Sequence, residues 1–291
     1  MGIGGDSGSG KSTLLAQLKS LIPSNSLLEL EGDGDHKWER GDKRWQRFTH
    51  LDPKANHLHR QSDHILRLKA AKSILRIEYD HSTGHFTQPQ VLEAKDYVVI
   101  CGLHPFYLPK MRRSIDLKIF LETDESLRQH WKVKRDTSNR GYTAEKVIEQ
   151  LETRMDDSRK YIQPQKEYAD LILNYFATVD PTTVPLGDPV PIRLRMTLDS
   201  SLQLDGLLDL ALHYGFEIEH DYSLDLKTQF LLVSCSEIIA PVQDIAQDLI
   251  ENLEEIMPLG GNWHTDYRGL VQLIIMMLVS QKRKDWYESG N

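Results

Sequence analysis

One glycine-rich segment constrains the fold more than any other feature: Gly5-Asp6-Ser7-Gly8-Ser9-Gly10-Lys11-Ser12, which fits the pattern G-x-x-x-x-G-K-[ST]. Glycines let the backbone N–H groups of such a loop wrap a phosphate chain, and the helix that follows adds its positive N-terminal end. Lys11 is expected to reach the β- and γ-phosphates, and the Ser12 hydroxyl to bind Mg²⁺. The segment therefore predicts a nucleoside triphosphate site formed by Gly5, Asp6, Ser7, Gly8, Ser9, Gly10, Lys11, Ser12 and Thr13. We call residues 5–12 the phosphate loop.

The apolar pattern of the first 180 residues predicts an α/β fold. Residues 1–5 leave room for only a short strand before the phosphate loop, and a helix is expected at residues 12–22, where Pro23 stops it. Apolar runs predict strands buried on both faces at residues 97–101 and 117–121, and short strands are expected at residues 27–30 and 171–175. Further helices are expected at residues 56–72, 125–134 and 143–161. Strands that alternate with helices indicate a parallel sheet flanked by helices on both faces.

Four prolines between Asp180 and Pro191 mark the best candidate for a domain boundary. We expect a core domain at residues 1–180 and a C-terminal α+β extension at residues 181–291. In the extension, strands are expected at residues 192–198, 216–219 and 230–234, and helices at residues 202–214, 238–257 and 267–284. The extension has no motif with chemistry of its own.

Charge and composition argue against several classes of protein. The chain has 35 Lys and Arg against 43 Asp and Glu, a formal net charge of −8, which argues against a general binder of nucleic acid or anionic membranes. Residues 1–180 carry a net charge of +2 and residues 181–291 a net charge of −10, so the front part keeps the cations that anionic ligands need. Two cysteines cannot form a disulfide framework, and no segment reads as a signal peptide or a membrane span. We therefore expect a cytoplasmic protein with neither nucleic acid nor membrane as a partner.

Five further segments combine glycine, histidine, tyrosine and charged residues in motif-like patterns. They are Gly32-Asp33-Gly34-Asp35-His36-Lys37-Trp38-Glu39-Arg40, Tyr79-Asp80-His81-Ser82-Thr83-Gly84, Gly102-Leu103-His104-Pro105-Phe106-Tyr107, Trp131-Lys132-Val133-Lys134-Arg135-Asp136 with Arg140-Gly141, and Tyr161-Ile162-Gln163-Pro164-Gln165-Lys166 with Tyr168-Ala169-Asp170. In this order, and together with the phosphate loop, they resemble the phosphoribulokinase/uridine kinase family of P-loop small-molecule kinases, on its phosphoribulokinase side.

The resemblance implies an ATP- and Mg²⁺-dependent kinase that transfers the γ-phosphoryl group to a hydroxyl of a small sugar or sugar phosphate. It implies that Asp33 is the general base for the attacking hydroxyl, and that Lys11, Lys132 and Arg135 stabilise the charge of the transferring group. Substrate contacts are implied at His36, Arg40, Tyr79, His81, His104 and Arg140. The expected Mg²⁺ ligands are Ser12, Asp33 and Asp136. The resemblance also implies a homodimer or a larger homo-oligomer.

Two positions depart from the family pattern. Cys101 ends a strand where the family has a Glu that helps to hold Mg²⁺, and a thiol is a poor ligand for a hard cation. Either Asp33, Asp35 or Asp136 compensates, or metal binding is weaker and the activity is low or altered. Asp35 replaces an aromatic residue and is expected to be either a second Mg²⁺ carboxylate or an exposed loop residue. Three nearby histidines are expected on the surface: His57, His59 and His64.

Two alternative functions stay open. The first is a nucleoside kinase of the uridine type, against which the segments around His81 and His104 argue. The second is a nucleotide-binding regulator with lost or weakened catalysis, which Cys101 favours. The presence of Asp33 and the cations near Arg135 argues against a regulator, because a pure nucleotide switch needs no acceptor site.

Overall fold

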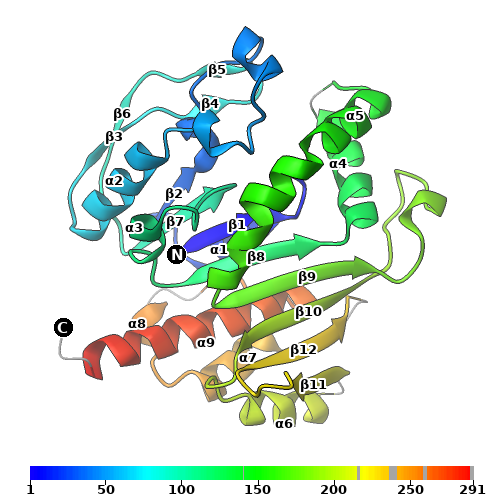
Figure 1. The fold of residues 1–291 in the computed structure, drawn as a ribbon. Helices are drawn as coiled ribbons and strands as arrows, with labels where there is room; N and C mark the ends of the chain where they lie inside the picture. Colours follow the sequence, from blue (N-terminus) through cyan, green and yellow to red (C-terminus); the bar gives the residue numbers. More distant parts are fainter. Residues whose placement is uncertain (140, 215–216, 236–240, 258–260, 289–291) are drawn as a thin grey trace.

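An eight-stranded sheet organises the molecule (Figure 1). The computed structural model of the chain describes residues 1–139, 141–214, 217–235, 241–257 and 261–288. Five strands of the sheet are parallel: β1 (Gly2–Gly5), β2 (Leu27–Glu31), β7 (Tyr97–Gly102), β8 (Lys118–Thr123) and β9 (Leu171–Ala177). Three antiparallel strands follow: β10 (Ile192–Asp199), β11 (Ile218–Tyr222) and β12 (Thr228–Ser234). The strand order β11-β12-β10-β9-β8-β1-β7-β2 confirms the predicted α/β fold with a parallel core and an α+β extension.

The central residues of β7 and β8 are apolar because both faces of the sheet are buried there. Val99 and Ile100 are neighbours on β7, yet Val99 belongs to the core cluster on one face of the sheet and Ile100 to the cluster on the other. Ile119 and Phe120 on β8 divide in the same way, as the two-residue period of a strand requires. All four are at most 2% exposed, which explains why these runs show no polar alternation.

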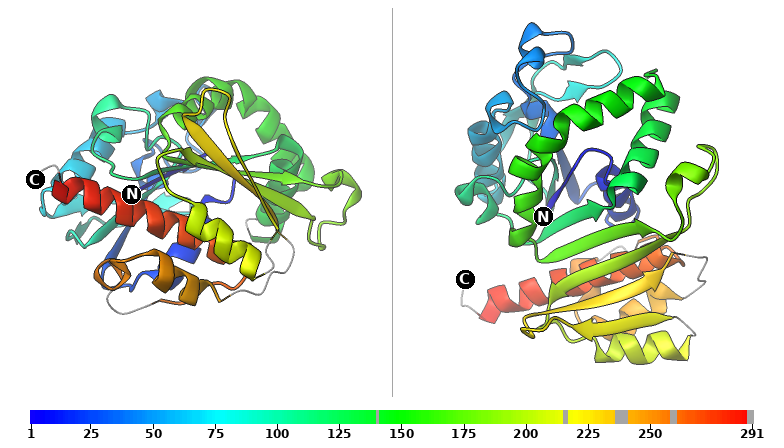
Figure 2. Two further views of the ribbon diagram at one scale, coloured as in Figure 1. Left: turned by 90° about the horizontal axis from the view of Figure 1, so that it is seen from below. Right: turned by 45° about the vertical axis from the view of Figure 1, so that its right-hand side comes forward.

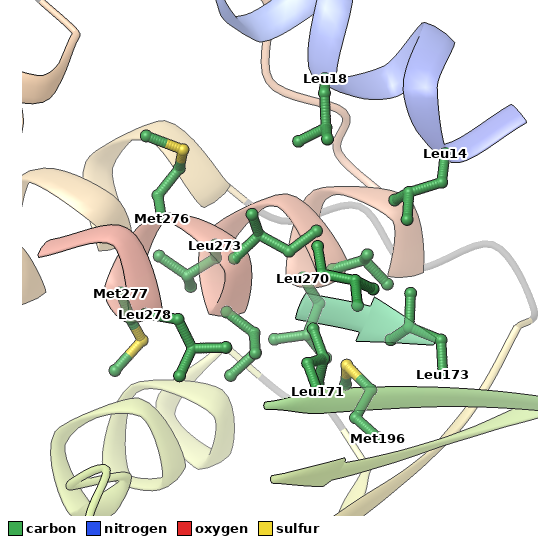
Figure 3. Packing of buried hydrophobic residues seen from close by; sticks show 14 of the residues in the cluster. Leu14, Leu18, Leu171, Leu173, Met196, Leu270, Leu273, Met276, Met277 and Leu278 are labelled. Carbon is green, nitrogen blue, oxygen red and sulfur yellow. The ribbon is translucent and has the colours of Figure 1, made fainter. Parts of the chain in front are cut away.

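Helices from opposite parts of the sequence cover one face of the sheet. They are α1 (Lys11–Leu21) and α9 (Tyr267–Glu288), and α9 lies along that face in both views of Figure 2. Figure 3 shows Leu14 and Leu18 of α1 facing Leu270 and Leu273 of α9. The side-chain amide of Gln272 also donates to the carbonyl oxygen of Gln17 at 2.8 Å. Shorter helices of the extension complete this layer: α6 (Asp205–His213), α7 (Val242–Leu249) and α8 (Leu253–Ile256).

The second face is covered by α2 (Leu58–Lys69) and α3 (Pro109–Arg112). Figure 1 shows α4 (Glu125–Asn139) and α5 (Ala144–Asp157) side by side beyond the strand ends. They pack on each other through Val133, Val147 and Leu151. A π-helix at Ser158–Ile162 continues α5. Two small ribbons stand apart from the main sheet: β3 (Ile74–Arg76) with β6 (Gln90–Leu92), and β4 (Tyr79–Asp80) with β5 (His85–Phe86). Short 3₁₀ helices occur at Gly32–Asp35, Lys43–Gln46, Pro53–Ala55, Gln163–Tyr168 and Pro181–Thr183.

Three predictions need correction. The single helix expected at residues 238–257 is wrong, because the described residues 241–257 form two helices separated by Ile250, which has an extended backbone. The break lets the Asn252 side chain accept a hydrogen bond from Ser280 of α9 at 2.6 Å. Asp35 is 0% exposed, so it is not an exposed loop residue, and His64, expected on the surface, is 8% exposed. Residues 216 and 238–240, which belong to predicted elements, lie outside the described residues.

The extension continues the sheet of the first part. β10 pairs with β9 from Ile192 to Leu198, and the largest core cluster contains residues from both sides of the predicted boundary. The boundary at residue 180 stays a prediction. Within the described ranges, no helix combines the length and apolar character that crossing a bilayer requires.

Candidate active site

A cavity of about 780 Å³ lies where β1, β2 and β7 end. Its walls come from the phosphate loop, from residues that follow β2 and β7, and from α4 and α5. In parallel α/β sheets, ligands bind outside the carboxyl ends of the strands, so this position is the expected one for a ligand.

The phosphate loop has the backbone that a phosphate cradle needs. Gly8 and Gly10 have φ values of +88° and +95°, which residues with a Cβ rarely adopt. The ammonium group of Lys11 donates to the carbonyl oxygens of Gly5 at 2.9 Å and Asp6 at 2.7 Å. Burial lowers the pKa of Lys11, against the opposing charges of nearby acidic groups, so an anionic ligand would stabilise its charged form. The predicted nucleotide contacts that line the cavity are Ser7, Gly8, Gly10, Lys11, Ser12 and Thr13.

Asp6 supports the phosphate loop through buried contacts. It is 3% exposed, accepts a hydrogen bond from the backbone of Ser7 at 2.6 Å, and is also bonded to the Ser158 hydroxyl. Arg128 of α4 lies 3.5 Å from the same carboxylate. These contacts connect the phosphate loop with the helices that form the opposite wall of the cavity.

Asp33 lies in the one-turn helix after β2 and faces two histidines. Its carboxylate oxygens lie 3.0 Å from Nε2 of His81 and 3.4 Å from Nε2 of His36. Burial acts to raise the pKa of Asp33, but the two histidines outweigh it and hold this pKa well below the ordinary range. The carboxylate is therefore ionised at neutral pH, as a proton acceptor must be. His36 is fixed in turn by Asn56, whose side-chain oxygen lies 2.8 Å from Nδ1.

Two cations of α4 share one carboxylate on the cavity wall. Lys132 Nζ lies 2.7 Å from one oxygen of Asp136, and Arg135 Nε lies 2.8 Å from the other. Arg135 Nη2 is buried and lacks a hydrogen-bond partner among the residues that the structure describes. Asp136 thus has both oxygens engaged with cations, so the geometry favours a role in holding these cations over the predicted role in binding Mg²⁺.

Arg154 of α5 is a cavity residue that the sequence motifs did not single out. It makes no ion pair or hydrogen bond with the described residues, although Asp6, Asp136 and Asp33 lie near enough to affect its pKa, which burial lowers. Val147, Leu151 and Arg154 have the spacing i, i+4, i+7 and so share one face of α5. A cation on the otherwise apolar face of a helix is the signal that could have found it.

Aromatic side chains surround the site on the side of Asp33. Trp45 stacks on His50 with ring centroids 3.9 Å apart, and the ring of His50 lies 4.7 Å from that of His36. Burial lowers the pKa of His50 to about 2, so its ring is neutral. The predicted substrate contacts that line the cavity here are His36, Arg40, Tyr79 and His81, whereas Trp45 and His50 carried no sequence signal.

Among the described residues, one predicted substrate contact does not line this cavity. His104 is 4% exposed, and its Nε2 lies 2.8 Å from the carbonyl oxygen of Leu51 beneath the site. Its position favours a structural role over contact with a substrate. Arg140 lies outside the described residues.

The position of Cys101 bears on which side chains could bind Mg²⁺. Cys101 lines the cavity, and burial raises the pKa of its thiol to about 12, so the sulfur is protonated at neutral pH. Glu31 of β2 pairs in register with Cys101 and lines the same cavity, as do Ser12 and Asp33. No three acidic, histidine or cysteine side chains in the described parts of the chain are grouped to hold a metal alone. One hydroxyl with one or two carboxylates nevertheless fits Mg²⁺ that takes its other ligands from phosphate and water.

Comparisons with known proteins agree with this geometry. The family model described as "Phosphoribulokinase / Uridine kinase family" matches residues 1–182. The phosphoribulokinase of Synechocystis sp. is 35% identical over 178 residues, which cover 61% of this chain and 54% of that protein. The chloroplastic phosphoribulokinase of Mesembryanthemum crystallinum is 30% identical over 234 residues, which cover 75% of this chain and 57% of that protein. The chain thus spans little more than half the length of these two curated relatives.

Two further comparisons concern a uridine kinase and a solved phosphoribulokinase structure. The uridine kinase of Borrelia hermsii is 34% identical over 180 residues, which cover 60% of this chain and 84% of that protein. The structure of the phosphoribulokinase from Rhodobacter spheroides aligns with a TM-score of 0.60 over 97% of both chains, at 18% identity. This last likeness concerns the fold, and it includes the strands and helices after residue 182.

Proposed function

Because the chain belongs to the phosphoribulokinase/uridine kinase family, we propose that it is an ATP-dependent kinase that phosphorylates a hydroxyl of a small sugar or sugar phosphate. One observation carries this proposal: a single cavity contains both a phosphate cradle and an ionised carboxylate on the acceptor side. A nucleotide switch needs the cradle alone. A kinase needs both, because the attacking hydroxyl must lose its proton as the phosphoryl group transfers.

In the proposed reaction, Asp33 accepts the proton of the acceptor hydroxyl. His36 and His81 keep its carboxylate oriented and ionised, so the base needs no reorganisation before the step. The oxygen that loses the proton attacks the γ-phosphorus, and ADP leaves with the electrons of the broken bond. Lys132, Arg135 and Arg154 are placed to stabilise the negative charge spread over the transferring group.

Magnesium would enter with the nucleotide. Ser12 and the carboxylate of Glu31 are the residues that would hold it, and it would neutralise charge on the β- and γ-phosphates. Asp33, whose two oxygens face His81 and His36, keeps the role of base. The neutral thiol of Cys101 takes no part in this ligand set.

The charges around Asp33 support an anionic acceptor. Arg40 lines the acceptor side, where its guanidinium donates to the carbonyl oxygen of His81 at 2.5 Å and pairs with no carboxylate among the described side chains. A sugar phosphate would supply the missing anion. The expected homodimeric or larger assembly and the cytoplasmic location stay predictions.

The test is an assay of ADP release with Mg²⁺-ATP and a panel of acceptors. The panel contains ribulose 5-phosphate, other pentose and tetrose phosphates, free sugars, sugar acids and uridine. Release that depends on a sugar or sugar phosphate supports the proposal, whereas release with uridine alone supports the nucleoside kinase. Tight ATP binding without any acceptor-dependent release supports the regulator.

A variant distinguishes a catalytic role of Asp33 from a general loss of structure. We expect Asp33→Asn to abolish turnover and to leave ATP binding intact, because the amide cannot accept the proton. Asp63→Asn, a change at an exposed carboxylate of α2, is the matched control and is expected to behave as wild type. Turnover that survives in Asp33→Asn would show that the base is another residue.

A further inference from the structure

Helices α4 and α5 carry the cations of the proposed reaction, yet α5 has no buried apolar side chain in the core of the sheet. All of its residues are described, and its buried apolar side chains, Val147 and Leu151, belong to a small cluster with Val133 of α4. This cluster is separate from the two larger clusters that cover the faces of the sheet. Other contacts must therefore set the position of α5 relative to the phosphate loop.

We propose that Asp6, Arg128 and Ser158 form a clamp that sets the distance between the phosphate loop and the cations of α4 and α5. Within the described ranges, none of the three lines the cavity, so they act through other side chains as positioning residues. The proposal rests on the proposed function, since it assumes that the cations of α4 and α5 act on the transferring phosphoryl group.

The carboxylate of Asp6 is shared between the loop and both helices. Its Oδ1 atom accepts a hydrogen bond from the backbone N–H of Ser7 at 2.6 Å and lies 3.5 Å from Nη1 of Arg128. Its Oδ2 atom accepts a hydrogen bond from the hydroxyl of Ser158. The three clamp residues are at most 7% exposed, so water competes little for these contacts and the low polarity around them strengthens the attraction.

Each helix is held one turn away from a cation that it carries. Arg128 precedes Lys132 by four residues on α4. Ser158, the first residue of the π-helix, follows Arg154 of α5 by four residues. Residues four apart lie on the same face of a helix, about 6 Å apart along its axis. One carboxylate therefore fixes the helix faces from which Lys132 and Arg154 reach the cavity.

Further contacts hold α4 against the phosphate loop. Nη1 of Arg128 donates to the carbonyl oxygen of Ser7 at 2.9 Å, and Nη2 donates to Glu125 at 2.7 Å. The rigid guanidinium is thereby fixed in one orientation. A Cβ at Gly8 would lie 3.1 Å from the Cβ of Lys132, so the loop touches α4 where this cation is attached. A shift of the helix would move the cation with it.

The charge of Asp6 also acts on the cation of α5. Burial lowers the pKa of Arg154, and Asp6 comes first among the charged groups that oppose this effect. Asp6 thus holds the end of α5 by a hydrogen bond and stabilises the charged guanidinium one turn earlier. Without this carboxylate, the chain would keep Arg154 but lose both contributions.

The clamp is expected to matter for catalysis more than for nucleotide binding. The loop binds phosphate with its own backbone N–H groups and with Lys11, and neither depends on α5. Stabilisation of the transferring group depends on where the cations lie, and a misplacement of about 1 Å can cost up to about 10²-fold in rate. Loss of the clamp should therefore lower kcat and leave the KM for ATP nearly unchanged.

The experiment compares kcat and the KM for ATP of acceptor-dependent ADP release. Ser158→Ala and Arg128→Met each remove one contact of Asp6, and Asp6→Ala removes the carboxylate itself. Ser158→Ala is also made in the Asp6→Ala background, which completes a double-mutant cycle. The matched controls are Ser24→Ala, at an exposed position, and Arg159→Met, next to the clamp but with 69% of its side chain exposed.

We expect Ser158→Ala and Arg128→Met each to lower kcat about tenfold and to change the KM for ATP by less than about twofold. In the Asp6→Ala background, Ser158→Ala is expected to lower kcat no further, because its partner is already absent. The controls are expected to behave as wild type. Additive losses in the cycle, an unchanged kcat, or a kcat that falls only together with ATP affinity would overturn the clamp.

Amide hydrogen exchange of Ser158→Ala provides a second measurement, which does not depend on turnover. We expect exchange in α5 to be about two- to tenfold faster than in wild type, the effect of one lost hydrogen bond, and exchange in α2 to be unchanged. This measurement also decides the matter if Asp6→Ala does not fold. Wild-type exchange in α5 would overturn the clamp.

The outcomes separate the clamp from the kinase. Faster exchange in α5 of Ser158→Ala, in a protein without acceptor-dependent ADP release, would uphold the clamp as the contact that places α5 and would overturn the proposed function. Acceptor-dependent ADP release with the wild-type kcat in Ser158→Ala would uphold the kinase and overturn the clamp.

Discussion

Replacement of Arg76 by Met is expected to lower the free energy of unfolding by about 3 kcal/mol, because it breaks a buried ion pair beneath the site. Arg76 is 1% exposed and Asp35 is 0% exposed, and Arg76 Nη1 lies 2.7 Å from Asp35 Oδ2. The guanidinium also bonds to the carbonyl oxygen of Glu31 and to Glu78 at 2.9 Å. It therefore fastens the loop that carries Asp33 to strand β3.

The size of the effect follows from the partners that remain. Loss of one member of a buried pair typically costs about 3–5 kcal/mol, since the other charge stays buried and unpaired. Asp35 would keep Arg60 at 3.0 Å and Gln61 at 3.1 Å, so we expect the lower end of this range. The double variant Asp35→Phe with Arg76→Met removes both charges and is expected to recover most of the loss.

Urea unfolding at neutral pH measures this prediction, with the midpoint and slope compared among variants. Lys19→Met is the control, since Lys19 pairs with Glu29 on the surface at 2.8 Å and with 54% of its side chain exposed. A surface pair of this kind is worth less than about 1 kcal/mol. If Arg76→Met costs no more than Lys19→Met, the ion pair does not stabilise the loop and the reasoning fails.

Three further predictions concern single residues. Arg154→Met is expected to lower kcat by about 10²-fold with little change in the KM for ATP, as steady-state kinetics would show, if this cation acts on the transition state. Burial lowers the pKa of His104 from 6.5 to about 4, so the unfolded chain binds more protons below pH 6.5 and stability falls with acidification. Between pH 7 and pH 5, this histidine is expected to lower the free energy of unfolding by about 2 kcal/mol. In His104→Gln, the decrease measured by urea unfolding should be smaller by this amount. Cys101→Ala is expected to change the Mg²⁺ requirement of turnover by less than about twofold, because a neutral thiol does not bind a hard cation and alanine adds no new ligand. A larger shift would give the sulfur a place at the metal.

Local patterns predicted much of the fold. The pattern required a short strand before the phosphate loop and a buried strand around Val99, and the structure has β1 (Gly2–Gly5) and β7 (Tyr97–Gly102) at these places. Both are contiguous segments whose structure is decided by neighbours in the sequence. The long helix at residues 238–257 failed because its apolar period runs on through Ile250. The break is accompanied by a tertiary contact, the hydrogen bond from Ser280 to Asn252, that no local pattern contains.

The same distinction holds for the site. Asp33, Lys132 and Arg135 lie in motif-like segments, and the structure brings all three to one cavity. Gln17 and Tyr267 are ordinary helix residues whose position in the cavity depends on packing between distant segments. Asp35 sits in a glycine-rich loop that usually faces water, and its burial depends on Arg76, which lies 41 residues farther along the chain.

The contact of α1 with α9 has a consequence for how the protein is made. The hydrogen bond from Gln272 to Gln17 spans 255 residues of sequence, and the apolar side chains beside it pack only when both helices are present. During synthesis, the apolar face of α1 therefore stays uncovered until α9 has left the ribosome. Such long-range closure slows folding and leaves the nascent chain prone to aggregation. We expect the order of assembly to run from the parallel strands outward, with the phosphate loop gaining its final support last.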